Sequence, residues 1–336
     1  MAGLLDSIIS VEFLFAILRV STPLIFPALG VAITAQSGNI NIGLEGIMLI
    51  AAFTGVVVSI FTESVMISLF AGVAAGVFFG WTLAYFHLRM KADIILAAVA
   101  LNFLASGLTI FLLIVITGGR STSGMRSLTF PRLAIPVLES IPVIGPALSG
   151  HNVLTYVAFL SVFIYYLVLF KTPLGLQIRA VGQNPDAASS VGINVNRVKT
   201  YALMISGFFG ALGGLYLSMG YVSWFSRDMT AGRGFIAVAA ATMGDNLALG
   251  TLGGSLLFGA VNALTIYIAS FDLPSDLVQA IPYAATVVVL TIYSARNFAP
   301  KRRAAIRARK GKGGSPPAVS PSPPAPSTPP QENQKE

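Results

Sequence analysis

The chain has 336 residues, of which 55% are hydrophobic and only 10% are charged, and its mean hydropathy is +0.79. A soluble domain of this size carries about 25% charged residues, so most of this surface cannot face water. Cysteine is absent, which excludes disulfides and thiolate chemistry, and the net charge of +8 is concentrated near the C-terminus.

Long apolar segments predict membrane-spanning helices. A helix crosses the hydrocarbon core with roughly 20 apolar residues and satisfies its own backbone hydrogen bonds there. Alternating patterns typical of a barrel are absent, and residues 1–10 lack the basic region of a secretory signal, so we expect them in the mature chain. Hydropathy predicts spans near 12–35, 42–61, 64–87, 93–117, 153–171, 200–220, 250–271 and 279–296, with a shorter apolar segment near 231–245.

The first informative polar cluster is SGNINIGLEG, between the first two spans. Its glycines permit a broken helix, and a carboxylate in or near the membrane favours a lined cavity or a buried partner. Two interpretations of Glu45 stay open: it lines the translocation path, or it caps a helix end. Asn102, inside the fourth span, is more typical of a helix–helix contact than of a ligand. The candidate residues of the substrate path are Asn39, Asn41, Glu45, Asn102 and Arg233.

The loop 171–199 encodes a short surface helix. Asn184 is a suitable N-cap, Pro185 suits the first turn, Asp186 complements the helix dipole, and Ala187 and Ala188 propagate the helix. Gly192 ends it, so the helix is predicted over 184–191. A capped polar helix of this kind favours a docking role over an ordinary ordered loop.

Two regions of the chain resemble each other. PALGVAIT (27–34) aligns with GALGGLYL (210–217), and EGIMLIAAFT (45–54) aligns with RGFIAVAAAT (233–242). The single span 153–171 between the halves reverses the second copy, which predicts an inverted repeat of four elements each. Arg233 aligns with Glu45, so the two charges could pair across the repeat axis. Asp245 and Asn246 are expected to cap the short apolar segment.

The tail is basic and then rich in proline and serine. From 296 to 312 there are eight basic residues and no acid: Arg296, Lys301, Arg302, Arg303, Arg307, Arg309, Lys310 and Lys312. Such a cluster after the last span is typical of a cytoplasmic flank beside anionic lipid rather than of nucleic-acid binding. Beyond Gly311 the composition predicts disorder.

Charge predicts the orientation. Six basic residues in the loops 87–92 and 171–199 join the eight of the tail, so 14 of the 21 lie on one predicted side, the cytoplasm. Arg120, Arg126 and Arg132 in the loop 118–152 oppose this assignment. The resulting domains are a transmembrane domain, 1–298, and a tail, 299–336. The transmembrane domain comprises halves at about 12–117 and 200–296, joined by the helix 153–171 and the loop 172–199.

Several chemistries have no motif. No GxxxxGK[ST] loop occurs, so the chain is not expected to hold ATP in the usual way. His87, which we expect at the interface, and His151 form no metal-ligand spacing, and no nucleophile–base constellation is present. We therefore expect no enzyme activity.

The loop from Arg179 to Ile193 resembles the coupling loop of bacterial ABC importer permeases of the branched-chain amino acid and simple-sugar type. The segment Ser37–Gly46 is similar to that of the nucleoside and simple-sugar members, and GRGFIAVAA (232–240) to the family's second-half signature. The resemblance covers about residues 15–296; the long tail departs from it. It implies that the loop docks on the ATPase, through Arg179, Gly182, Asn184, Pro185, Asp186, Ala187, Ala188 and Gly192.

The resemblance also implies the fold and the partners. The expected fold is an all-α polytopic membrane protein, a type II ABC importer permease with nine to ten transmembrane or re-entrant helices in an inverted repeat. The implied partners are a separate ATPase that binds ATP and Mg²⁺, a second permease (this chain or a paralogue), an extracytoplasmic solute-binding protein and the bilayer. The expected location is the bacterial cytoplasmic membrane, with the C-terminus cytoplasmic.

The solute stays open at this point. Asparagine-like partners suit neutral, hydroxyl-rich solutes, so nucleosides come first, simple sugars second and branched-chain amino acids third. An ion-coupled secondary transporter would need ionisable or carbonyl-rich ion sites within the spans, for which Glu45 is the one candidate. A membrane scaffold would tolerate the loss of Glu45 and Asn102.

Overall fold

A computed structural model describes residues 11–134 and 144–269, with residues 284, 287, 288 and 291. The chain divides into two units, Met1–Leu290 and Thr291–Glu336, and the described helices all belong to the first. Apart from residues 284, 287, 288 and 291, the predicted span 279–296 lies outside the described residues, and so does the whole tail 299–336.

Seven helices in the described part are long and apolar enough to cross a membrane. Each corresponds to a span predicted from hydropathy, so a multi-pass membrane protein is confirmed. They are α2 (Val11–Gln36), α3 (Leu44–Thr62), α4 (Val65–Ala84) continued by the π-helical turn η1 (Tyr85–Arg89), α5 (Ile94–Thr117), α8 (Val153–Lys171), α11 (Val195–Leu215) continued by the π-helical turn η2 (Tyr216–Tyr221), and α13 (Ala248–Ala269). The short apolar segment forms α12 (Arg233–Met243).

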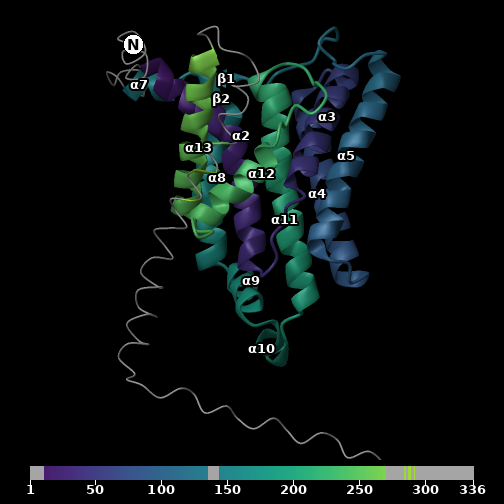
Figure 1. The fold of residues 1–336 in the computed structure, drawn as a ribbon, viewed down its shortest axis with the longest axis vertical. Helices are drawn as coiled ribbons and strands as arrows, with labels where there is room; N and C mark the ends of the chain where they lie inside the picture. The colour runs from purple at the N-terminus through teal and green to yellow at the C-terminus, as the bar shows by residue number, and fades with distance from the viewer. Residues whose placement is uncertain (1–10, 135–143, 270–283, 285–286, 289–290, 292–336) are drawn as a thin grey trace, which may run out of the picture. The chain divides into compact units, whose positions relative to one another are not determined.

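The two halves run in opposite directions, as an inverted repeat requires. The end of α2 lies beside α9 (Pro173–Gln183), whereas α11 begins just after α10 (Pro185–Ser190) and leads away from it (Figure 1). α3 leads away from the end that carries α9 and α10, here called the α10 end. α12 leads toward that end, where the Gln36 side chain donates to the Asn246 carbonyl oxygen.

Small residues bring the central helices together. A Cβ added to Gly80 of α4 would lie 2.5 Å from the Leu203 carbonyl oxygen of α11, and one added to Gly76 would lie 2.8 Å from that of Gly207. α4 and α11 therefore meet backbone to backbone. Helices in membranes often associate in this way, because no hydrophobic force drives them together and close packing at small residues replaces it. We call this contact the glycine seam.

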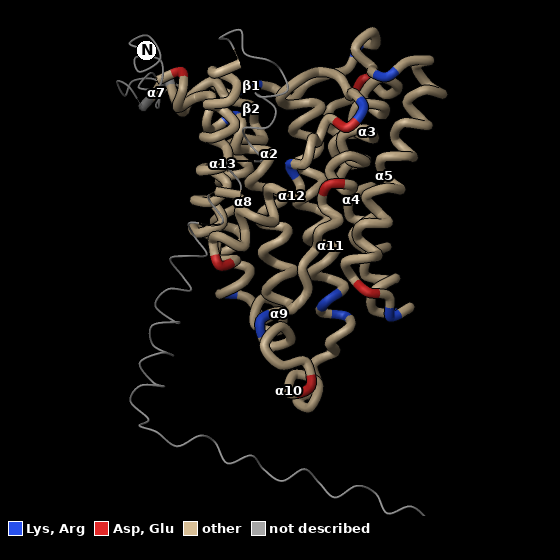
Figure 2. Tube along the Cα trace, in the orientation of Figure 1, with Lys and Arg blue, Asp and Glu red and all other residues tan. Residues whose placement is uncertain are grey.

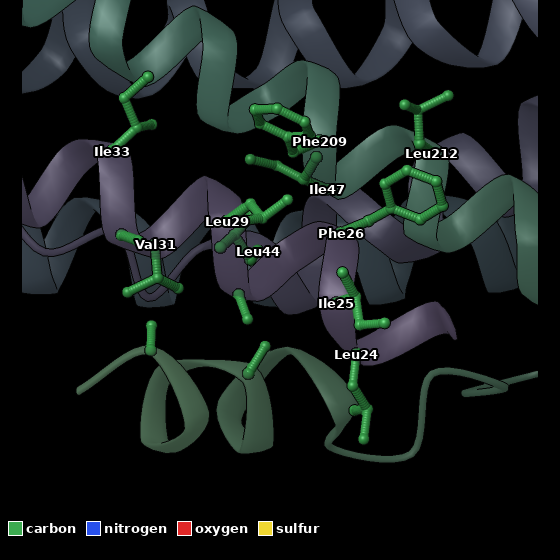
Figure 3. Packing of buried hydrophobic residues seen from close by; sticks show 14 of the residues in the cluster. Leu24, Ile25, Phe26, Leu29, Val31, Ile33, Leu44, Ile47, Phe209 and Leu212 are labelled. Atoms are coloured by element: carbon green, nitrogen blue, oxygen red, sulfur yellow. The ribbon is translucent and has the colours of Figure 1, made fainter. Parts of the chain in front are cut away.

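The core lies between α2, α3 and α11. Nearly every residue of α2 from Leu18 to Thr34 is buried, whereas α5 buries only a narrow stripe. Figure 3 shows apolar side chains of the three helices meeting in this core: Leu24, Ile25, Phe26, Leu29, Val31, Ile33, Leu44, Ile47, Phe209 and Leu212.

The segment after α8 is more helical than predicted. Residues 172–199 were expected to form a loop with one short helix, but α9 occupies most of the first half and α11 begins at Val195. The Thr172 hydroxyl accepts from the Gly175 amide and caps α9, whose first residue is Pro173. The apolar residues of α9 are interspersed with polar residues and glycines over only 11 positions, so a hydropathy search for spans does not reveal it.

A small hairpin at the end opposite α10 was not predicted. β1 (Arg132–Leu133) pairs antiparallel with β2 (His151–Asn152), next to the short helix α7 (Ile144–Leu148). His151 is 3% exposed, lies 3.9 Å from the Phe15 ring in a stacked arrangement, and has its Nε2 2.9 Å from the Ala147 carbonyl oxygen. Burial lowers the pKa of His151 below its ordinary value of 6.5; the Ala147 contact partly opposes this, and Arg19 adds to it.

This buried histidine predicts acid sensitivity. Below pH 6.5 the unfolded chain binds a proton at His151 that the folded chain does not, so folding stability falls as the pH is lowered. We expect thermal unfolding in detergent to occur at lower temperature at pH 5.5 than at pH 7.5, and His151→Gln to reduce this difference. An unchanged difference in His151→Gln would contradict the assignment.

Candidate functional site

The Glu45 carboxylate joins the two broken helices. It lies in the first turn of α3, and its Oε1 and Oε2 accept hydrogen bonds from the backbone amides of Gly232 (2.8 Å) and Gly234 (2.7 Å) at the N-terminus of α12. An acid at a helix N-terminus is favoured by the helix dipole. The local sequence permits the contact because a Cβ on Gly234 would lie 2.5 Å from the Glu45 amide nitrogen.

The aligned pair Glu45 and Arg233 therefore lie together, but the bond differs from the predicted ion pair. The carboxylate binds the amides on either side of Arg233, and the Arg233 guanidinium donates to the carbonyl oxygens of Met229 and Thr230. The free backbone amides at a helix N-terminus form an anion-binding site, so they bind the carboxylate in place of the guanidinium. In this structure the Glu45 carboxylate therefore caps the start of α12.

Asn102 fastens α5 to the start of α3. Its side chain donates to the Ile42 carbonyl oxygen (3.0 Å) and accepts from the Gly46 amide (2.8 Å). Both amide groups are thus used by backbone atoms of an unwound segment, which is the helix–helix contact predicted for this residue.

Glu45 and Asn102 also line one cavity of about 350 Å³. Its wall includes α3, α5 and the irregular segment before α12, and Phe103 and Phe235 stand beside it, 75% and 50% exposed. Asp228 and Ser106 add polar groups, with the Ser106 hydroxyl donating to the Asp228 carboxylate at 3.1 Å. We call this hollow the α5 cavity.

Sequence reasoning missed Asp228, Ser106 and the two phenylalanines. Asp228 is in SRDMTAGRG, which has the composition of a turn, and its left-handed backbone (φ 51°) agrees with that. The usable signal was a charged residue between two segments predicted to enter the membrane.

The other three predicted path residues lie elsewhere. Asn41 is fully buried, where it donates to the Ser206 hydroxyl and accepts from the Gly43 amide. Asn39 accepts from the Lys199 ammonium group at 3.3 Å, toward the α10 end. Arg233 lines a separate cavity of about 100 Å³ with residues of α2 and α13. Of the five predicted path residues, Glu45 and Asn102 thus share the α5 cavity, whereas Asn39, Asn41 and Arg233 are not among the residues that line it.

The predicted docking helix, now α10, projects at the α10 end of the molecule (Figure 1). The Asn184 side chain caps it by accepting from the Ala187 amide at 3.0 Å, and Gly192 follows in a left-handed conformation (φ 86°). Of the eight predicted docking residues five are exposed: Asn184, Pro185, Asp186, Ala187 and Gly192.

The remaining three docking residues contact the rest of the chain. Ala188 is 4% exposed, Arg179 lies over the Phe170 ring at 4.8 Å, and Gly182 contacts the turn after α2. They are therefore suited to hold the helix pair against the spans rather than to touch a partner. Two exposed apolar side chains at this end were missed, Val191 (76% exposed) and Leu176 (62%).

Gly182 and Gly38 form a direct contact between α9 and the α2–α3 turn. A Cβ on Gly182 would overlap the Gln36 carbonyl oxygen and lie 3.0 Å from the Gly38 nitrogen. Gly38 itself has φ 83°, a conformation that favours glycine. The turn that leads to Glu45 thus rests on the last turn of α9 without an intervening side chain.

The charged residues of the described part gather at its two ends (Figure 2). The α10 end carries Arg89, Lys91, Lys171, Arg179, Arg197 and Lys199. The segments after α5 and before α12, and the hairpin itself, carry arginines as well, among them Arg120, Arg126, Arg132 and Arg227. Glu45 and Arg233 belong instead to the joined first turns of α3 and α12.

Residues 13–290 match a protein family described as branched-chain amino acid transport system / permease component. The guanosine ABC transporter permease protein NupQ of Bacillus subtilis is 38% identical over 298 residues, which are 85% of this chain and 93% of that protein. The nucleoside ABC transporter permease protein NupC of Lactococcus lactis is 33% identical, over 84% of this chain and 92% of its own length.

A putative glucose ABC transporter permease protein of Haloferax volcanii is 31% identical over 78% of this chain and 79% of that protein. Among solved structures, PsaBC from Streptococcus pneumoniae in complex with Fab shares the fold, with a TM-score of 0.50, 14% identity, and coverage of 86% of this chain and 94% of that chain.

Proposed function

The chain belongs to the family of branched-chain amino acid transport system permease components, and from that premise we propose that it forms the membrane path of an ATP-driven nucleoside importer. Its closely matched relatives of nearly equal length are named for guanosine and nucleosides. The chain would carry the solute, while a separate ATPase subunit would bind ATP and Mg²⁺ and hydrolyse the nucleotide.

The observation that carries this proposal is the α5 cavity, which sets a few polar groups in a largely apolar wall on an exposed helix face. Polar and ionisable side chains inside a membrane face water or protein, because lipid contact is costly for them. α5 exposes large apolar side chains around the cavity, including Leu96 and Phe111. A second permease, identical or paralogous, placed over this face would enclose the cavity between the two subunits and leave Glu45, Asn102 and Asp228 in an aqueous path.

The chemistry of the cavity suits a nucleoside. Phe103 and Phe235 offer aromatic faces on which a base can stack, an interaction worth about 1–3 kcal/mol per base in other proteins. Ser106, Asp228 and the Thr230 hydroxyl offer partners for ribose and for the base edge. Simple sugars are the second candidate, since the relative from Haloferax volcanii is named for glucose.

The α10 end is proposed to receive the ATPase. The exposed face of α10 and the apolar Val191 and Leu176 would enter a groove of that subunit, and α9 would pass movement to the α2–α3 turn through Gly182. The proposal therefore assigns the α10 end and the C-terminus to the cytoplasmic side of the bacterial inner membrane. An extracytoplasmic solute-binding protein would then dock at the hairpin end.

The proposal is tested by uptake into proteoliposomes that contain this chain, its second permease and its ATPase, with the solute-binding protein added on the opposite side. We expect guanosine uptake to require ATP on the ATPase side and to continue when ion gradients are collapsed. Excess unlabelled nucleoside should compete, whereas glucose and leucine should not. Uptake that follows an ion gradient without ATP would instead indicate a secondary transporter, and competition by glucose would move the solute assignment to sugars.

Reversing the charge of α10 should uncouple transport. Asp186→Lys places a cation at the N-terminus of α10, which is unfavourable for the helix dipole, and changes the exposed face proposed to dock. We expect weaker co-purification of the ATPase and lower ATP-driven uptake, with unchanged thermal stability of the permease. Glu63→Lys, an equal charge change at the exposed end of α3, is the control. Unchanged assembly and uptake in Asp186→Lys would exclude the docking role.

A further inference from the structure

A second large hollow lies at the α10 end, between α4 with its π-helical turn η1 and the start of α11. It has a volume of about 640 Å³, and its wall includes Trp81, Tyr85, Arg89, Asn194 and Arg197. The residues of the α5 cavity and of α10 are not among those that line it. Its position and lining therefore call for a separate explanation.

The two arginines of this hollow carry positive charge that the described part of the chain does not neutralise. Arg89 and Arg197 are both exposed, and no ion pair to either is found among the described residues. Asp93 is the acid nearest to Arg89 in sequence, but its carboxylate accepts from the amides of Ile95 and Leu96 as the cap of α5. Two guanidinium groups on one hollow favour an anion with several oxygens, such as a phosphate group.

The aromatic residues place this hollow at the membrane interface. On the exposed face of α4, Phe78 stacks on Trp81 at 5.9 Å, and Trp81 lies 5.7 Å from Tyr85. Trp81 and Tyr85 are 44% and 45% exposed. Tryptophan and tyrosine gather where acyl chains meet headgroups, so the row leads from the apolar surface of α4 to the depth of a lipid phosphate.

The backbone forms the hollow and keeps it open. α4 ends in the π-helical turn Tyr85–Arg89, in which the Met90 amide donates to the Tyr85 carbonyl oxygen. The glycine seam fixes α11 beside α4 just above, and the Asn194 side chain accepts from the Arg197 amide to begin α11. Arg89 and Arg197 are thus presented from two helices that cannot easily separate.

We propose that this hollow binds the headgroup of an anionic phospholipid. The phosphate lies between Arg89 and Arg197, and the glycerol and upper acyl chains lie along Trp81 and Tyr85. Basic pockets between helices at a membrane surface are suited to such headgroups. A lipid bound there bridges α4 and α11, and α11 directly follows the helix pair α9–α10. This proposal depends only on the chain lying in a membrane, and it does not depend on which solute the chain carries.

The test measures lipid retention by native mass spectrometry of the full chain in its assembled complex. Phosphatidylglycerol is offered beside phosphatidylcholine, and wild type is compared with Arg89→Gln/Arg197→Gln. We expect wild type to retain one more phosphatidylglycerol per chain than the double variant. The affinity of the double variant should be on the order of thirtyfold weaker, because each basic residue contributes about fivefold. Arg120→Gln/Arg126→Gln removes two exposed charges at the hairpin end and should retain the lipid like wild type.

Two further arms separate a lipid from other occupants. Trp81→Ala should weaken retention of phosphatidylglycerol, and millimolar inorganic phosphate should not displace the lipid, because phosphate lacks the acyl contacts. Equal retention by wild type and the double variant, or equal retention of phosphatidylcholine, would overturn the proposal. Full displacement by inorganic phosphate would assign the hollow to a free anion, and loss of the lipid when the ATPase binds would assign it to the subunit interface.

Discussion

Glu45→Ala should reduce guanosine uptake to near background and lower the thermal stability of the permease in detergent. The substitution removes the acceptor of the Gly232 and Gly234 amides, which lie 2.8 and 2.7 Å from the carboxylate oxygens. A half-buried donor left without a partner costs about 1–3 kcal/mol, and two donors are affected here. The start of α12 should therefore loosen, and with it the wall of the α5 cavity.

Glu45→Gln separates the charge from the shape of this side chain. Glutamine retains one carbonyl oxygen, so we expect intermediate stability and intermediate uptake, since one amide keeps its acceptor. Glu63→Gln, at the exposed end of the same helix, should behave like wild type. Stability and uptake that stay at wild-type levels in Glu45→Ala would show that the link between α3 and α12 is dispensable.

Gly182→Val should impair coupling more strongly than any substitution on the exposed face of α10. A side chain at this position overlaps the Gln36 carbonyl oxygen and pushes α9 away from the α2–α3 turn. Overpacking of a close contact costs about 1–3 kcal/mol, and part of the strain should be released by moving α9. We expect ATP hydrolysis to continue in the assembled complex while uptake falls at least severalfold.

The measurements that check this are ATP hydrolysis and uptake on the same proteoliposomes, expressed as solute carried per ATP. Gly253→Ala is the control, since a Cβ there meets nothing within 4 Å. Gly182→Ala should give a smaller loss than Gly182→Val, because alanine adds one side-chain carbon at this contact and valine adds three. An unchanged ratio of uptake to hydrolysis in Gly182→Val would show that movement does not pass through this contact.

Most of the transmembrane architecture could be predicted from the sequence because long apolar segments have few other stable conformations in a membrane. The span predicted at 153–171 coincides with α8, and the aligned segments near Glu45 and Arg233 do begin the two oppositely directed broken helices. The helix α10 was predictable from its caps, since Asn184, Pro185 and Gly192 act within a few residues of one another.

What the sequence could not reveal depends on contacts between distant segments. The partners of Glu45 are backbone amides 187 and 189 positions away, and a backbone amide has no sequence signature. Asp228 and Ser106 are 122 positions apart, and neither segment carries a local pattern that predicts their hydrogen bond. α9 and the small hairpin were missed because each is short and its stability comes from neighbours rather than from its own hydropathy.

The glycine seam restricts how the permease can change shape. Side chains act as spacers that let neighbouring rods rotate or slip past each other, and at Gly76, Gly80 and Gly207 there are none. A sliding movement would bring the two main chains into steric overlap, so α4 and α11 have to move together as one rigid body. The conformational changes that open and close the permease then fall to elements held by side-chain hydrogen bonds, which can break. These elements are α5, held through Asn102, and α12, held through Glu45.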